Sequence, residues 1–138
     1  MELLGRLGEA AHLVRRNWLE PLFARYGVQA GEFDVLATLR RSGAPYALTP
    51  TELFETTMIS SGGMTSRLDR LERAGWVTRA RNPKDRRGIL VSLTEAGVSL
   101  MDGMIPVHVA NEHEALKHLS VQEQQALNRM LEKLNAGL

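Results

Sequence analysis

The chain has 138 residues, of which 43% are hydrophobic and 24% are charged, a composition typical of one folded domain rather than a disordered chain. It contains no cysteine, which excludes disulfides, thiolate catalysis and zinc–thiolate sites. No apolar run approaches the roughly 18–20 residues of a membrane span and no signal peptide is visible, so we expect a cytoplasmic protein without a membrane partner.

The net charge of +1 hides an uneven distribution of charge along the chain. Between Arg67 and Arg87 there are eight basic and three acidic residues, whereas from Glu95 to the C-terminus there are six acidic and three basic residues. Of the 17 basic residues, 14 are arginine, the cation that pairs with phosphates and base edges through a planar fork. One segment of the chain therefore suits an anionic partner, and the C-terminal part does not.

The N-terminal residues predict an amphipathic helix over about residues 2–25. Its apolar positions recur at steps of three and four: Leu3, Leu7, Ala11, Val14, Trp18 and Leu22. Pro21 should bend this helix near its end, because proline removes a hydrogen bond of the preceding turn. A second, shorter helix over about residues 33–40 is predicted to end at Ser42-Gly43.

A helix-turn-helix pattern follows. Residues 49–52 read Thr-Pro-Thr-Glu, a capping box with proline in the first turn, so a short helix begins there and ends before Met58. The next helix begins near Ser60 or Ser61 and is stopped by Gly75. Two short helices joined by a tight turn are typical of a DNA-binding helix-turn-helix.

The hydrophobic period then changes from helical to extended. Residues 76–81 and 89–93 predict two strands, and the polar residues 82–88 predict the loop between them. A hairpin directly after a helix-turn-helix is a wing. Beyond it, Thr94 caps a long helix that contains Pro106 as a bend, and a second capping box at residues 120–123 begins the last helix.

These elements define the expected fold class: mainly α with one β-hairpin, a winged helix-turn-helix that dimerises through its N- and C-terminal helices. The whole chain, residues 1–138, is one domain. The dimerisation helices cover about 1–26 and 95–138, and the winged lobe covers about 30–94. The apolar stripes of the terminal helices exceed what a small lobe can cover, which predicts a homodimer.

The second helix of the motif is the candidate recognition helix. Its inner face carries Met64, Leu68 and Leu71. Small and hydroxylated residues at its outer N-terminal end, together with an arginine farther along, are the candidate DNA contacts: Ser60, Ser61, Gly62, Thr65, Ser66 and Arg70. Such an end can enter a major groove with little bulk and with free N–H groups. Taken alone, the pattern equally fits a capped helix in a crowded turn.

The wing favours DNA. Its predicted tip carries Asp85, Arg86 and Arg87, and an arginine on a thin hairpin can enter the narrow, negative minor groove. A carboxylate near phosphates is unfavourable by charge alone, so we expect Asp85 to pair with Arg87 and fix its orientation. In an isolated hairpin these residues would read as a solvated charged tip, but after a helix-turn-helix they predict contact with double-stranded DNA.

At this point the chain resembles a known family. Asp85-x-Arg87 followed by Leu93-Thr94 is similar to the wing signature of MarR-family regulators, and residues 68–72 with Gly75-Trp76-Val77 resemble that family's recognition-helix exit. The resemblance covers nearly the whole chain. It implies a dimeric transcriptional regulator that binds a pseudo-palindromic site, with half-sites about one helical turn apart, and that represses by excluding polymerase.

Three further stretches, residues 33–39, 48–53 and 119–124, resemble the urate-responsive subfamily typified by HucR. The resemblance implies a ligand site of Asp34, Arg67 and Arg79 for a small aromatic anion such as urate, whose binding releases DNA. The subfamily's ligand-binding tryptophan has no counterpart here, and Trp18 lies on a different helix. The alternative is that Asp34 pairs with an arginine and holds the lobes together without any ligand.

Other functions have weaker support. His108 and His113 are five residues apart, about 140° around a helix, and do not converge on one metal ion. The sequence shows no nucleophile elbow, phosphate-binding loop or paired catalytic carboxylates, so we expect neither an enzyme nor a cofactor. The main alternative is a ligand-insensitive winged-helix module for protein interactions, which leaves the basic segment and the arginine-rich tip unexplained.

Overall fold

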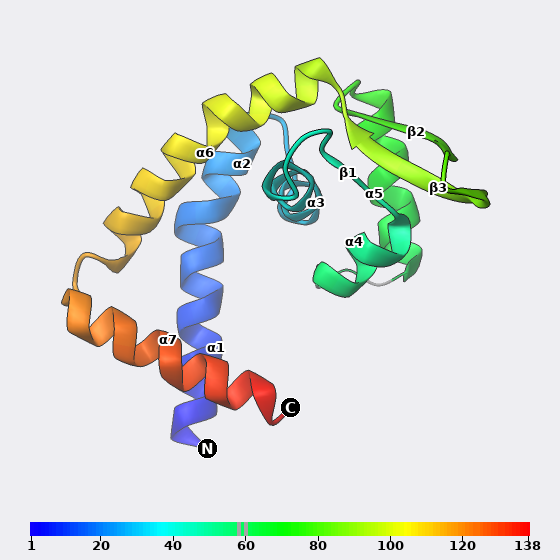
Figure 1. Ribbon diagram of the computed structural model, residues 1–138. Coiled ribbons are helices and arrows are strands. Elements are labelled where there is room, and N and C mark those ends of the chain that lie inside the picture. The colour runs from blue at the N-terminus through cyan, green and yellow to red at the C-terminus, as the bar shows by residue number, and fades with distance from the viewer. Residues whose placement is uncertain (58, 60) are drawn as a thin grey trace.

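The computed structural model describes residues 1–57, 59 and 61–138, and Ser61 through its backbone alone. Ser60 and Met58 therefore lie outside the described residues. Figure 1 shows a mainly helical chain with a small antiparallel sheet at one side, which confirms the predicted fold class. The elements in chain order are α1 (Glu2–Val14), a π-helical segment (Arg15–Leu19), α2 (Glu20–Arg25), α3 (Ala30–Arg41), β1 (Ala47–Leu48), α4 (Pro50–Thr56), α5 (Ser61–Arg73), β2 (Val77–Asn82), β3 (Asp85–Leu93), α6 (Glu95–Leu116) and α7 (Val121–Ala136).

Side-chain caps explain where several helices begin. At α4 the Thr49 hydroxyl accepts from the backbone N–H of Glu52 at 3.2 Å, and the Glu52 carboxylate accepts from the Thr49 N–H at 3.1 Å. The same reciprocal pair, Ser120 and Glu123, begins α7. These contacts satisfy N–H groups that the first helical turn leaves unpaired. Both predicted capping boxes are confirmed.

The N-terminal helix contains a π-helical turn just before Pro21, where the sequence analysis predicted a bend. Pro21 has no N–H to donate to the carbonyl four residues earlier, and the π-helical segment Arg15–Leu19 contains that residue, Asn17. The segment carries Trp18, whose carbonyl accepts from the Asn111 side chain of α6 at 2.7 Å. The distorted turn is therefore fixed against α6.

The sheet has three strands in the order β1-β3-β2 and not the two of a simple hairpin. The sequence analysis did not predict β1, which pairs Ala47 with Ser92 and Leu48 with Val91. The predicted 82–88 loop is also too long. Asn82 pairs directly with Asp85, so only two residues form the turn and the arginines after it lie within β3.

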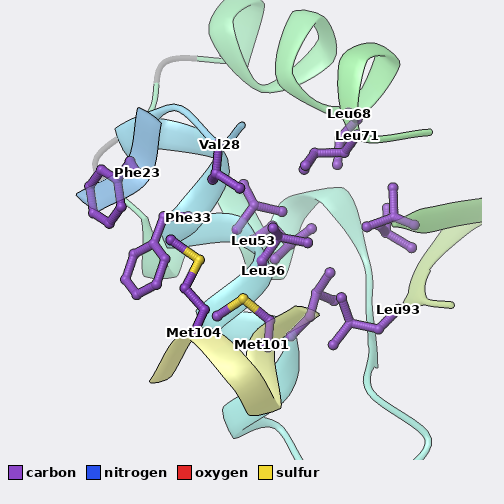
Figure 2. Close-up of a cluster of buried hydrophobic side chains, with 14 of the residues drawn as sticks. Phe23, Val28, Phe33, Leu36, Leu53, Leu68, Leu71, Leu93, Met101 and Met104 are labelled. Atoms are coloured by element: carbon purple, nitrogen blue, oxygen red, sulfur yellow. The ribbon is translucent and has the colours of Figure 1, made fainter. Parts of the chain in front are cut away.

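The core lies where α2, α3, α5, α6 and the sheet meet. Figure 2 shows Leu36 and Leu53 close to Leu68, Leu71 and Leu93, with Met101 and Met104 of α6 below them. Most of these side chains are fully buried. Pro106 lies inside α6, which curves along its length in Figure 1. Within the winged lobe, α4, α5 and the sheet thereby pack on α3, and the lobe packs on the first half of α6.

The terminal helices contrast with this core. Among the described residues, α1 and α7 contain no buried side chain, and their apolar residues are strongly exposed: Leu3 is 79% exposed, Val121 65% and Met130 62%. No helix of the described residues is both long enough and apolar enough to cross a bilayer. The apolar stripes predicted from the sequence are therefore present, and within one chain they are uncovered.

Candidate nucleic-acid interface and neighbouring cavity

The recognition helix α5 has the two faces that its sequence predicts. Met64, Leu68 and Leu71 are buried against the core, whereas Gly62 and Ser66 are exposed. Among the described residues, nothing lies within 4 Å of the position that a Cβ atom on Gly62 would take, and Thr65 is exposed nearby on the helix. The predicted contact Ser60 lies outside the described residues, as does the side chain of Ser61. The described N-terminal half of α5 thus presents a surface of small side chains that can approach DNA closely.

Arg70 does not project freely from α5. Its Nε lies 3.1 Å from Oε1 of Glu32, a carboxylate of α3 whose side chain is 2% exposed. The Arg70 side chain itself remains 42% exposed. The sequence analysis placed Arg70 on the outer face of the helix and did not detect this partner, because Glu32 lies 38 positions earlier in the chain.

The wing turn is held by two side chains that accept from the backbone. Asn82 Oδ1 accepts from the N–H of Lys84, and Asp85 Oδ1 accepts from the N–H of Arg87, each at 3.0 Å. The expected ion pair between the Asp85 and Arg87 side chains is not formed, because the carboxylate binds the backbone instead. Asp85 therefore orients the turn rather than the guanidinium, and Arg86 and Arg87 extend from β3 as exposed cations.

Arg79 connects the wing to the recognition helix. Its guanidinium on β2 binds Asp69 at 2.7 Å and Glu72 at 3.2 Å, both on α5, and its backbone N–H also donates to Glu72. The hydrogen bond with Glu72 raises the pKa of Arg79 and lowers the pKa of Glu72. Two carboxylates thus hold Arg79 on the outer side of α5, beside a separate cavity of about 430 Å³.

A larger cavity of about 500 Å³ lies on the other side of α3, between the π-helical segment, α2 and α6. Its walls include a series of rings: the centroids of Phe23 and Phe33 are 4.7 Å apart, and those of Phe33 and His108 are 4.6 Å apart. The full lining is Val14, Arg15, Trp18, Leu19, Phe23, Ala30, Phe33, Asp34, His108, Asn111, Glu112, Ala115 and Leu116. The cavity can accept a flat aromatic molecule.

Two polar groups of this cavity are suited to bind a ligand. Asp34 is exposed at the edge of the cavity, and partial burial raises its pKa against the opposing charges of Arg41 and His108. His108 Nε2 lies 3.1 Å from Glu112, whereas its Nδ1 is buried and has no hydrogen-bond partner among the described residues. A carboxylate and a ring nitrogen therefore face a largely apolar space.

The structure does not bring together the three residues that the resemblance implied as ligands. Asp34 lines the larger cavity, Arg67 donates to the Gln29 side chain at the first turn of α3, and Arg79 lies on the far side of α5. In their place, Arg15, Trp18 and His108 meet Asp34 at the cavity. The sequence places Trp18 on the apolar stripe of the N-terminal helix, close to Pro21. No local pattern, however, indicates that residues 15–18 lie beside α6 and line a cavity with it.

Comparison with known proteins places this geometry in a family. The MarR family model matches residues 26–88. The regulator PecS of Dickeya dadantii is 40% identical over the whole of this chain and 82% of its own length. The chain belongs to the MarR family of transcriptional regulators. It is thus a DNA-binding regulator and not an enzyme, and a winged helix used for protein contacts alone does not account for this relationship.

Two solved structures of the family contain DNA. A point mutant of MarR from Escherichia coli bound to operator DNA is 32% identical, covers 95% of this chain and 92% of its own, and superposes with a TM-score of 0.84. The Streptomyces coelicolor regulator Sco3205 in complex with DNA is 28% identical, covers 99% of this chain and 86% of its own, and gives a TM-score of 0.89. This chain therefore shares its fold with family members that bind DNA, and with one that binds operator DNA.

Proposed function

We propose that this MarR-family regulator is a homodimeric repressor that binds a pseudo-palindromic duplex site and leaves it when a small aromatic molecule enters the cavity beside Asp34. The observation that carries this proposal is the position of the cavity. It lies on one side of α3, and the recognition helix packs on the other. A ligand that prefers one arrangement of α3 would shift the population of DNA-binding states.

The uncovered terminal helices support the dimer. Leu3 and Leu4 of α1 are 79% and 70% exposed, and the apolar residues of α7 are similarly uncovered. A two-fold partner that uses the same helices would cover both stripes at once. Two recognition helices related in this way would meet successive major grooves about one helical turn apart.

Each lobe offers two sets of DNA contacts. The first is the N-terminal part of α5 with Gly62, Thr65 and Ser66, to which Ser60 and Ser61 are added from the sequence. The second is the wing, where Arg86 and Arg87 would reach the minor groove from a turn fixed by Asp85. A dimer that covers a promoter in this way excludes polymerase, which favours repression as the output.

The chemistry of the cavity limits the effector. Trp18, Phe23 and Phe33 offer apolar and aromatic surface, and Asp34 offers a hydrogen-bond acceptor. The resemblance to the urate-responsive subfamily supports a planar anion such as urate. In this cavity such an anion would meet Arg15 and His108, while an N–H of the ligand donates to Asp34. Arg67 of α5 would act through its hydrogen bond to Gln29, the N-cap residue of α3, and not as a direct ligand.

Titration of effector into the protein–DNA complex tests the proposal. A labelled operator duplex, selected as a bound fragment of the host genome, is followed by fluorescence anisotropy as urate or phenolic anions are added up to the millimolar range. Release is expected in the wild type and should be blunted in Asp34→Asn and Arg67→Ala. Asp102→Asn is the matched control for Asp34→Asn, because Asp102 does not line the cavity, and it should release DNA normally. If no planar anion alters DNA binding, the cavity is not the effector site.

A further inference from the structure

Glu32 is a buried carboxylate at the start of α3. Its Oε2 accepts from the backbone N–H of Gln29 at 2.8 Å and so closes the cap of the helix. The side chain is 2% exposed, and its second oxygen, Oε1, has no hydrogen-bond partner among the described residues. An ionised carboxylate in such a position is unfavourable unless a cation lies beside it.

The cation is Arg70 of the recognition helix, whose Nε is 3.1 Å from Oε1. This 3.1 Å contact is an ion pair and not a hydrogen bond, because Oε1 accepts none from the described residues, so Glu32 takes up none of the guanidinium's five N–H donors. Four of these donors belong to the two terminal nitrogens, on a side chain that is 42% exposed. Arg70 is thus paired with a buried charge and is still partly open to solvent.

Arg70 lies on the side of α5 that carries the proposed DNA contacts. Ser66 and Arg70 are four residues apart and lie on the same side of the helix, one turn from each other. Ser66 is exposed on the small outer surface of α5 that faces the groove. A cation one turn farther along that side reaches the phosphates that border the groove.

We propose that Glu32 is a positioning residue for DNA binding: its ion pair with Arg70 fixes the guanidinium beside α3 so that the N–H donors left free contact a DNA phosphate. Arg70 does not exchange Glu32 for the phosphate, because departure would leave a buried carboxylate without a counter-charge. It contacts both at once. Fixing the guanidinium before DNA arrives removes the cost of ordering a long side chain on binding. This inference concerns the DNA contact and does not depend on an effector.

The experiment uses the salt dependence of DNA binding, which counts phosphate contacts and which a purely internal ion pair leaves unchanged. The full-length protein is titrated onto a fluorescein-labelled, random-sequence duplex of about 30 base pairs, some three helical turns, at a series of salt concentrations. Arg70→Gln should lower the slope of log K against log salt by about 0.9 per protomer. Arg129→Gln on α7 is the charge-matched control and should leave the slope unchanged.

The variant Glu32→Gln distinguishes two roles of Glu32: it either orients Arg70 for DNA or competes with DNA for Arg70. Glutamine keeps the capping box, because it also accepts at this position, but it removes the charge that holds Arg70. We expect a loss of about threefold to tenfold in DNA affinity at a constant salt slope, since the arginine contact persists but is less well ordered. Tighter binding by Glu32→Gln would overturn the proposal, because Glu32 would then be competing with DNA for Arg70.

Two further variants complete the test. The first separates the charge of Arg70 from its shape, and the second distinguishes a loss of DNA binding from a failure to fold. Arg70→Lys retains a charge without the fork, so the salt slope should persist while affinity falls. The double variant Glu32→Gln with Arg70→Gln leaves neither charge uncompensated and should fold even if Arg70→Gln alone does not. Its slope should match the lowered value. A wild-type slope in the variants that lack Arg70 would show that Arg70 is an internal tether and would refute the proposal.

Discussion

A Cβ atom on Gly97 would overlap the carbonyl oxygen of Trp76, so the first turn of α6 and the start of β2 are in direct contact at this glycine. The Thr94 hydroxyl, which caps α6, also donates to the carbonyl of Gly75 at 2.6 Å. The wing and the long helix therefore meet at a junction without spare space.

Gly97→Ala should destabilise the protein by at least about 2 kcal/mol, because the opposing atom is backbone and cannot rotate away. Gly103→Ala on the same helix is the control: nothing lies within 4 Å of its Cβ position, and alanine should stabilise the helix by up to about 1 kcal/mol. Denaturant unfolding measures both changes. Equal stabilities of the two variants would show that α6 and β2 are not in tight contact at Gly97.

At the wing, we expect the removal of a negative charge to weaken DNA binding, the opposite of what charge repulsion alone predicts. Asp85→Ala removes a negative charge near DNA but also the acceptor that holds the Arg87 N–H, so DNA binding should weaken. Asp85→Asn keeps an acceptor at the same place and should bind at least as tightly as wild type. Arg87→Ala should lose about 1–3 kcal/mol per contact. Anisotropy titrations compare the three, and tighter binding by Asp85→Ala would show that the turn needs no orienting acceptor.

The Arg79 cluster gives stability a defined pH dependence. The hydrogen bond from Arg79 lowers the pKa of Glu72 in the folded state, so the ionised form favours folding. This contribution is present above the pKa that Glu72 has in the unfolded chain and is lost as pH falls through its lower folded pKa. Glu72→Gln should therefore melt below wild type at neutral pH, and the difference should close in acid. A difference in melting temperature that is constant with pH would contradict the assignment.

The dimer is tested on α7. Leu127→Glu places a charge on an apolar stripe that a second copy would cover, and the variant should unfold rather than give a clean monomer if the interface resembles a core. Gln125→Glu adds the same charge to a polar position of the helix and should remain dimeric. Analytical ultracentrifugation distinguishes the outcomes. A folded native monomer of the wild-type protein at micromolar concentration would contradict the homodimer.

The sequence predicted the features that local chemistry controls. Thr49 with Glu52 and Ser120 with Glu123 set helix starts through contacts three residues apart, and Pro21 distorted the turn before it. The predicted boundaries failed where the determinant is a distant partner. β1 has two residues and exists because Ala47 and Leu48 pair with β3, which no local pattern indicates.

The candidate site shows the same difference between features that depend on local sequence and features that depend on distant partners. The residues of the recognition helix and wing follow from helical phase and from turn chemistry. The partners of the arginines do not, because each depends on three-dimensional packing: Arg70 meets Glu32, and Arg79 meets Asp69 and Glu72. The cavity around Asp34 is lined by five elements: α1, the π-helical segment, α2, α3 and α6. Resemblance identified Asp34, and the structure added Trp18 and His108 as its neighbours.

Asp34 should make the folded protein less stable at neutral pH. Burial raises its pKa, so the native state binds a proton more readily than the unfolded chain, and charging the carboxylate opposes folding. Asp34→Asn should therefore raise the melting temperature at neutral pH. As pH falls through the raised pKa, wild-type Asp34 becomes protonated and the difference should narrow. Asp102→Asn serves as the control, because it removes a carboxylate that binds Arg40 at 2.8 Å and should lower the melting temperature.

A carboxylate retained at a cost in stability is expected at a functional site rather than in a structural ion pair. The same Asp34→Asn sample therefore also distinguishes a functional carboxylate from a structural one. Higher stability together with a blunted response to urate would identify Asp34 as an effector contact. Lower stability at neutral pH would instead mean that its attraction to Arg41 and His108 outweighs the cost of burial, as in the alternative where Asp34 holds the lobes together without a ligand.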